Sequence, residues 1–384
     1  MLIGLDNISA GLSTSPQTIG GMRMYLTNLV ESLLQYSDNQ IQLFSPKWFE
    51  SPFPADLARL TDKRLAGVPI NRVARVLYEQ SRYRPEIEAA HPLVFIGLSN
   101  SIPYGLSIPS AIFVKSLQYI YTPEAFSLVR RTYLQWTIQL TARQAKILIV
   151  PTQTTGDDLQ KVTGINPDKI RVVPEALYIR NKNVLEQNNG DSLRLSINRL
   201  TDNRPFILCV GATYPYKNLE RLILAFARLK NQLLSPLVLL LIGAEGGLTY
   251  KVIKQIAQDA GVGECVICAG RRPYDEIVAA YHLAKLMVMP TLYETFGHPI
   301  LEAMACDCPV VTSNFGAVSE IARSAAVLVD PFDIESIATG MLCVLTDESR
   351  RRSLIQKGRT RSSEFSWKSV ALNISEILKE ISIE

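Results

Sequence analysis

The sequence predicts an α/β protein with two domains, each built on a doubly wound parallel β-sheet. Its 384 residues exceed the usual range of a single domain. Short apolar runs alternate with segments of helical periodicity in both halves, which is the pattern of a parallel sheet covered on both faces. Each half also opens with a strand, a glycine-containing loop and a helix, a unit that presents ligands to the carboxyl edge of such a sheet.

Composition narrows the class of protein. The apolar fraction of 47% supports two full cores, and the net charge of +4 argues against a bulk nucleic-acid binder. The apolar run around residues 237–242 is too short to span a bilayer, and residues 1–6 lack the pattern of a secretory signal. All six cysteines lie from Cys209 onward, as expected for small buried side chains in a reducing compartment. We expect a cytoplasmic protein without nucleic-acid partners.

Two cysteine pairs invite a zinc interpretation: Cys265 with Cys268, and Cys306 with Cys308. Residues 264–270 are expected to form a strand entering a turn, and side chains three positions apart on a strand point to opposite faces. No histidine lies at ligand spacing near either pair. No metal site is expected.

The first half begins with a strand at residues 2–6, a loop that ends at Gly20-Gly21, and a helix over 22–36. A glycine pair alone is more often a plain turn than a ligand loop. Thr152 or Thr154 is suited to cap the helix that follows the strand at 147–150. Further buried strands are expected at 41–44, 93–98, 111–114 and 147–150, with helical segments between them such as 133–146.

Basic residues gather between positions 59 and 84, interleaved with acidic ones. The common meaning is a mixed, solvated helix face. A membrane-surface patch is the alternative, and it would suit a lipid-linked acceptor. The basic residues are Arg59, Lys63, Arg64, Arg72, Arg75, Arg82 and Arg84, and the acidic ones are Asp56, Asp62, Glu79, Glu86 and Glu88.

The second half follows a polar, asparagine-rich stretch, 179–204, which we interpret as a linker. A strand at 206–210 and a helix at 219–229 flank Lys217. A lysine at a helix start opposes the helix dipole, and a bound diphosphate would supply the missing negative charge. Further strands are expected at 236–243, 286–290, 310–311 and 327–331, and further helices at 252–259 and 370–381.

The stretch 289–309 contains the main candidate ligand-binding residues of the second half. Glu294 and Glu302 stand in an E-x7-E spacing, separated by a Gly-containing turn and by Pro299, which suits a first helical turn. The start of such a helix offers N–H groups to an anion. Glu302 is expected in that first turn, where its carboxylate would accept hydrogen bonds from sugar hydroxyls such as those of ribose. The plain alternative is a strand–loop–helix turn whose acidic residue favours the helix dipole.

The longer sequence around Glu294 and Glu302 is more specific than their spacing alone. Y-E-T-F-G-H-P-I-L-E-A-M-A, followed by P-V-V-T-S-N, resembles the donor-binding segment of retaining glycosyltransferases of family 4, which have the GT-B fold. The resemblance covers the second half well and the first half in outline. It implies two Rossmann-like domains facing each other across a cleft, without a divalent metal. Residues 1–178 would bind the acceptor and 205–365 the nucleotide sugar, and a C-terminal helix within 366–384 would pack back on the first domain.

The resemblance also implies roles for residues. Glu302 would hold the ribose, Glu294 a sugar hydroxyl, and Lys217 the leaving diphosphate. Arg271 and Arg272 stand where the family holds the base, although an arginine pair at a loop start is more often surface charge, and loop packing is the alternative for His298. The implied donor-binding residues are Gly20, Gly21, Lys217, Gly243, Arg271, Arg272, Glu294, Thr295, Phe296, Gly297, His298, Pro299, Ile300, Leu301 and Glu302, with Lys217 and Glu294 as the catalytic ones.

The chain departs from the family pattern at three places. Many members have an arginine directly after the glycine at 211, where this chain has Ala212. Many have a His-Asp pair after the strand at 111–114, where this chain has Lys115 and Ser116. Lys115 and Gln118 are candidates for the acceptor side, although a solvated strand end is the simpler interpretation of Lys115. The usual Asn-Gly turn near position 175 is Glu175-Ala176 here.

The function implied is transfer of a hexosyl unit, with retention, to a growing polysaccharide or lipid-linked glycan, at the inner face of the membrane if the basic segment makes a peripheral contact. A UDP-sugar such as UDP-glucose is the favoured donor and GDP-mannose the second. No D-x-D triplet occurs, in agreement with catalysis without a metal. The alternatives are an epimerase or phosphorylase of the same fold, and a non-catalytic nucleotide-sugar-binding partner of another transferase.

Overall fold

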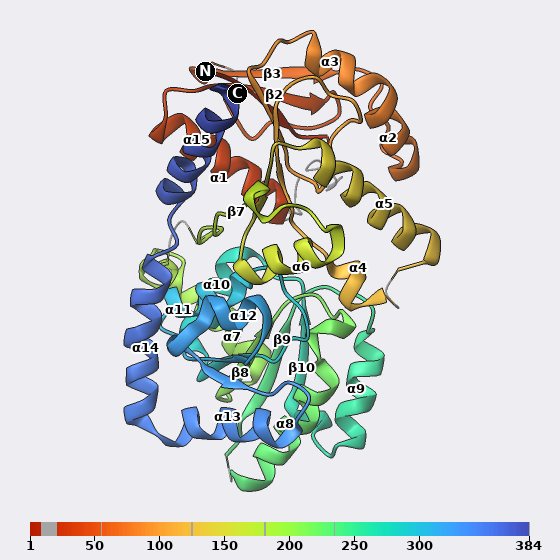
Figure 1. Ribbon diagram of the computed structural model, residues 1–384. Coiled ribbons are helices and arrows are strands. Elements are labelled where there is room, and N and C mark those ends of the chain that lie inside the picture. The colour runs from red at the N-terminus through yellow and green to blue at the C-terminus, as the bar shows by residue number, and fades with distance from the viewer. Residues whose placement is uncertain (9–20, 55, 124–125, 180–181, 234, 384) are drawn as a thin grey trace. The chain divides into compact units, whose positions relative to one another are not determined.

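The computed structural model describes residues 1–8, 21–54, 56–123, 126–179, 182–233 and 235–383. They form two compact units, the first of Met1–Tyr178 with Ser366–Glu384 and the second of Ile179–Phe365. Each unit holds one parallel sheet with helices packed against it (Figure 1), which confirms the predicted fold class.

The first unit contains a seven-stranded sheet in the order β3-β2-β1-β4-β5-β6-β7, and all its strand pairs are parallel. Its strands are β1 (Leu2–Asp6), β2 (Gln40–Pro46), β3 (Leu60–Leu65), β4 (Val94–Gly97), β5 (Ser110–Phe113), β6 (Ile147–Val150) and β7 (Ile170–Val172). Its helices are α1 (Gly21–Tyr36), α2 (Arg72–Tyr78), α3 (Arg84–Glu88), α4 (Gln118–Tyr121), α5 (Leu128–Gln144), α6 (Gln153–Thr163) and α15 (Trp367–Ile383), with a π-turn at Glu79–Tyr83.

The C-terminal helix α15 lies beside α1 (Figure 1). The rings of Tyr25 and Trp367 meet edge to face, with centroids 5.4 Å apart, and the indole N–H of Trp367 donates to the Leu177 carbonyl oxygen at 3.1 Å. Because buried aromatic rings bring large apolar areas together, this contact holds the end of the chain against its beginning.

The basic segment does not form one solvated helix face, because β3 occupies part of it. Lys63 pairs with Glu86 at 2.8 Å, and Arg75, 3% exposed, lies 4.0 Å from Glu79. Arg59 donates to backbone carbonyls, including Ser37 O at 2.6 Å. Most of these cations are therefore paired with carboxylates or carbonyl oxygens of the same unit. Arg64 and Arg84 are paired in the same way, with Asp62 and Glu88.

The second unit contains a six-stranded parallel sheet in the order β10-β9-β8-β11-β12-β13. Its strands are β8 (Phe206–Val210), β9 (Val238–Ile242), β10 (Val266–Gly270), β11 (Leu286–Met289), β12 (Val310–Ser313) and β13 (Val327–Val329). Its helices are α7 (Gly190–Thr201), α8 (Leu219–Gln232), α9 (Tyr250–Asp259), α10 (Tyr274–Leu283), α11 (His298–Ala305), α12 (Gly316–Ala322), α13 (Ile334–Thr346) and α14 (Glu348–Ser363).

Most of the stretch interpreted as a linker, residues 182–204, is structured and belongs to the second unit. Helix α7 occupies its second half, with Leu193 and Ile197 buried one turn apart. That i, i+4 pair is enough to pack a helix on α10, although the surrounding polar residues hide the periodicity. Within the described ranges, no helix is long and apolar enough to cross a membrane.

Cys265 lies outside the strand in which it was expected. It ends a 3₁₀ turn at Gly263–Cys265, and β10 begins at the next residue. The opposite-face argument against zinc therefore does not apply to Cys265 and Cys268. Both are free thiols, and no cluster of three or more His, Cys, Asp or Glu side chains suited to a metal occurs among the residues described.

Candidate functional site

The second sheet reverses its winding between β8 and β11. These strands are neighbours, with β9 and β10 on one side of them and β12 and β13 on the other. Connections leave β8 and β11 in opposite directions, and ligands of open α/β sheets bind at such a switch point. Lys217 follows β8 and Glu294 follows β11, so the two predicted catalytic residues lie on the two sides of this point.

Gly243 allows the loops after β8 and β9 to approach each other. A methyl group on Gly243 would lie 1.9 Å from the carbonyl oxygen of Gly211, a distance no real contact permits. The Gly243 N–H donates to Gly270 O at 2.9 Å, which brings the end of β10 to the same place. Gly243 thus has a steric role in assembling this edge of the sheet.

Asn218 joins three loops and was missed by the sequence analysis. Its side chain, in a residue 4% exposed, donates to Pro290 O at 3.0 Å and Pro331 O at 2.7 Å. Its φ of 59° lies in the left-handed region, which asparagine tolerates better than most residues. The Lys-Asn dipeptide just before a helix was the available signal.

Lys217 and Glu294 form an ion pair. The ammonium and the carboxylate are in contact, and their side chains are only 11% and 17% exposed. The Leu292 N–H donates to Tyr216 O at 2.7 Å, and this bond connects the loops after β8 and β11 beside the ion pair. Burial lowers the pKa of Lys217, but the charge and hydrogen bond of Glu294 and the nearby Tyr216 outweigh it, so that the pKa is raised.

Helix α11 begins as predicted, after Gly297 in the left-handed region (φ 96°) and with Pro299 in its first turn. The side chains of Phe296, Ile300 and Leu301 are buried, so only their backbones can face a ligand. The Ile300 N–H donates to Gly297 O at 3.0 Å and is already used. Pro299 has no N–H. Pro299 and Ile300 are therefore excluded as backbone donors at this helix start, where unpaired N–H groups are otherwise expected. Thr295 and His298 are partly exposed.

Glu302 is not in the first turn of α11, which begins at His298; it lies in the second turn. It is 6% exposed, and two hydroxyls donate to its carboxylate: Tyr274 to Oε1 at 2.6 Å and Tyr281 to Oε2 at 3.0 Å. Burial, and then the Glu302 charge, raise the pKa of both tyrosines, so they stay protonated donors. The two tyrosines, seven residues apart on one face of α10, were missed; that spacing was the signal.

The two neighbouring arginines, Arg271 and Arg272, differ in exposure and in their contacts. Arg271 is exposed, whereas Arg272 donates to Ala269 O at 3.0 Å and lies 3.8 Å from a carboxylate oxygen of Glu276. Arg272 is held against its own loop and helix, and Arg271 is the more accessible of the two predicted base contacts.

The first unit contributes a different cluster. Gly20 lies outside the described residues, and Gly21 begins α1. Lys115 is not a solvated strand end: it pairs with Glu175, and its ammonium lies 3.1 Å from the ring centroid of Tyr25. Burial lowers the pKa of Lys115, and the opposing effect of Glu175 does not fully restore it. Gln118 starts the short helix α4 and is partly exposed.

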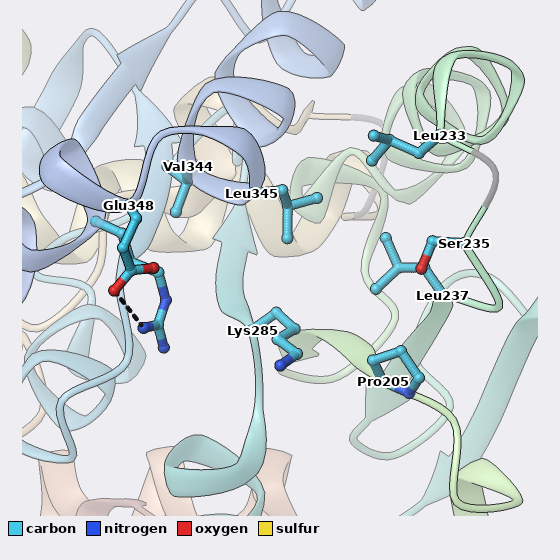
Figure 2. A pocket seen from close by; sticks show the side chains of 9 residues that line it. Pro205, Leu233, Ser235, Leu237, Lys285, Val344, Leu345 and Glu348 are labelled. Atoms are coloured by element: carbon cyan, nitrogen blue, oxygen red, sulfur yellow. Dashed lines mark ion pairs between the residues drawn. The ribbon is translucent and has the colours of Figure 1, made fainter.

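A cavity of about 320 Å³ lies elsewhere in the second unit (Figure 2). Its lining includes Pro205, Leu237 and Lys285, which directly precede β8, β9 and β11. It therefore opens at the amino edge of the sheet, opposite Lys217 and Glu294. Glu348 and Arg351, 3.9 Å apart, form another part of its wall.

Comparisons with known proteins match both halves of the chain. The family described as "Glycosyltransferase Family 4" matches residues 19–177, and that described as "Glycosyl transferases group 1" matches 195–361. The sucrose-phosphate synthase structure from Thermosynechococcus elongatus has a TM-score of 0.76 at 20% identity, covering 99% of this chain and 98% of that one. At this identity the likeness shows the fold alone.

Curated relatives are similar over shorter stretches. The chain is 32% identical over 162 residues to O-antigen chain mannosyltransferase B of Escherichia coli, which is 42% of each protein. It is 32% identical over 250 residues to the MMP alpha-(1->4)-mannosyltransferase of Mycolicibacterium hassiacum, which is 64% of this chain and 56% of that protein. The chain thus spans about half the length of these two relatives.

Proposed function

The chain belongs to glycosyltransferase family 4 and has the GT-B fold, and from this premise we propose that it is a retaining hexosyltransferase using a nucleoside diphosphate sugar. The observation that carries the proposal is the Lys217–Glu294 pair at the switch point of the second sheet, four residues before α11. A cation, a carboxylate and a helix start converge there, and these are the groups that a leaving diphosphate and a sugar hydroxyl require.

Each group has a distinct role in this proposal. Lys217 stabilises the charge that develops on the departing diphosphate, together with the N–H groups at the start of α11. Glu294 accepts a hydrogen bond from the donor sugar. Glu302 accepts from the ribose hydroxyls with the lone pairs that Tyr274 and Tyr281 do not use, since a carboxylate can accept about four hydrogen bonds. The first unit supplies the acceptor contacts.

The reaction needs no protein base. The acceptor oxygen attacks the anomeric carbon on the face from which the diphosphate departs, and the bond from that carbon to the phosphate oxygen breaks. The leaving phosphate oxygen takes the acceptor's proton, so the configuration is retained and the charges balance. Lys217 lowers the barrier by stabilising the phosphate as its charge grows. A single positioned donor of this kind contributes about 10²–10³-fold to kcat.

The donor remains a choice between two classes. The family resemblance favours a UDP-sugar such as UDP-glucose, with GDP-mannose second. The names of the two curated relatives are those of mannosyltransferases, which supports a mannosyl unit. The proposed acceptor is a growing polysaccharide or a lipid-linked glycan, in keeping with the O-antigen role named for one of them.

Thermal stability against UDP, GDP and ADP and their sugars tests the donor site. A ligand at a hundredfold excess over its Kd stabilises the folded state by about 2.7 kcal/mol. We expect one nucleotide class to raise the Tm, with no effect of a chelator, and the shift to be lost in Lys217→Ala and Glu302→Ala. Lys285→Ala, a lysine change at the opposite edge of the sheet, is the control and should keep it.

Turnover then separates the function classes. A transferase consumes the stabilising nucleotide sugar only when a glycan or lipid-linked acceptor is added. Isomerised sugar in the absence of acceptor would identify an epimerase, and sugar phosphate formed from a glycan and inorganic phosphate a phosphorylase. Binding without turnover would support a non-catalytic partner, and no nucleotide shift at all would remove the donor site from the proposal.

A further inference from the structure

The ammonium that is proposed to hold the donor diphosphate is already neutralised. Lys217 is in contact with Glu294, and both side chains are largely withdrawn from water, with 11% and 17% exposure. Neither charge can lose its partner there without a large penalty, because an unpaired buried charge is costly. An incoming diphosphate must therefore compete with Glu294 for the same cation.

The competition is unequal for the two nucleotide species. A nucleotide sugar offers Glu294 a hydroxyl of its transferable sugar in exchange for the lysine. A nucleoside diphosphate lacks that sugar, and its ribose hydroxyls are assigned to Glu302. After transfer the terminal phosphate is no longer esterified and can carry more negative charge, which increases its repulsion from the carboxylate at short range. The Glu294 carboxylate therefore gains a hydrogen bond when the intact donor binds, and it weakens binding of the nucleoside diphosphate product.

We infer that Glu294 exchanges Lys217 for a hydroxyl of the donor sugar when the donor binds, and returns to Lys217 after transfer, so that its charge favours release of the nucleoside diphosphate. This inference rests on the proposed function and extends it: the residue discriminates between substrate and product as well as contacting the sugar. The loops are suited to a local exchange because Asn218 and the Tyr216–Leu292 hydrogen bond hold the backbones on both sides of the pair.

The test is titration calorimetry with UDP, GDP, UDP-glucose and GDP-mannose on the full chain and on Glu294→Gln, which keeps the shape and removes the charge. We expect Glu294→Gln to bind the cognate nucleoside diphosphate about tenfold more tightly, equivalent to 1.4 kcal/mol, and to bind the nucleotide sugar no more tightly than wild type. The ratio of the two affinities therefore falls or inverts. Glu335→Gln, which removes a charge from a surface pair with Arg228, should leave both affinities unchanged.

A second measurement needs no substitution. Wild-type protein should bind nucleotide sugars that lack the hydroxyl contacted by Glu294 no better than the nucleoside diphosphate, and a set of monodeoxy donor sugars finds that hydroxyl. If Glu294→Gln binds the diphosphate equally or more weakly while wild type binds it normally, the exchange is wrong and the proposed function stands. If neither protein binds any nucleotide, the donor site itself is wrong, and the inference falls with it.

Discussion

The ammonium of Lys115, which follows β5, is paired with the carboxylate of Glu175, which follows β7. Both side chains are largely buried, with 14% and 10% exposure. These are two of the positions at which the chain departs from the family pattern, where His-Asp and Asn-Gly are usual. The two departures are therefore complementary: each charge is tolerated at the sheet edge because the other is present.

Breaking that pair should destabilise the protein strongly. Lys115→Met leaves Glu175 buried without its partner, and we expect the free energy of unfolding to fall by about 3–5 kcal/mol. The double variant Lys115→Met with Glu175→Leu should recover most of this loss. Urea denaturation measures both. Arg171→Ala, which removes an exposed pair with Glu380 in the same unit, should cost at most about 1 kcal/mol. If Lys115→Met and Arg171→Ala lower the free energy of unfolding equally, the burial argument is contradicted.

Tyr274→Phe should weaken nucleotide binding without removing any charge. It deletes the hydroxyl that donates to Glu302 at 2.6 Å, and a buried acceptor left short of a partner costs about 1–3 kcal/mol. In calorimetric titrations we expect the Kd of the ribonucleotide to rise by about 5- to 140-fold, and the Kd of its 2′-deoxy form to change less. Equal losses for the two nucleotides would show that Tyr274 supports the fold rather than orienting Glu302 toward ribose.

The Lys217–Glu294 pair should resist alkali. The pKa of Lys217 is raised above 10.5 in the folded protein, so the pair's contribution to stability is present below about pH 10.5 and is lost as pH rises through the folded pKa. The difference in unfolding free energy between wild type and Lys217→Met should stay constant from pH 6 to about 9. A midpoint for the Lys217 side chain below 10.5, measured by NMR titration, would be inconsistent with the pair.

Gly243→Ala should disturb the site mainly through packing. Its methyl group would lie 1.9 Å from Gly211 O, so the backbone must move. We expect a loss of about 1–3 kcal/mol in stability and loss of nucleotide binding. Gly261→Ala isolates the cost of a positive φ, because Gly261 has a φ of 73° and open space around it; it should retain binding. A fully active Gly243→Ala would show that the loops do not need this close approach.

The sequence alone was sufficient for the fold class and for the strands and the helix that carry the candidate site residues. Buried strands are continuous apolar runs in a sheet covered on both faces, so β8, β9 and β11 were visible without structure. Gly297 and Pro299 predicted the start of α11, because a left-handed turn and a first-turn proline are local preferences. Helix α7 was missed because its apolar face consists of few residues within a polar stretch.

What a side chain contacts was decided by tertiary structure. Lys217 and Glu294 are 77 residues apart and meet because β8 and β11 are neighbours at the switch point. Glu302 meets Tyr274 and Tyr281 because α10 packs on α11, and Lys115 meets Glu175 across the edge of the first sheet. Local propensity determines where helices and strands begin and end, but the pairing of buried charges depends on strand order and helix packing, which bring distant residues within a few ångströms.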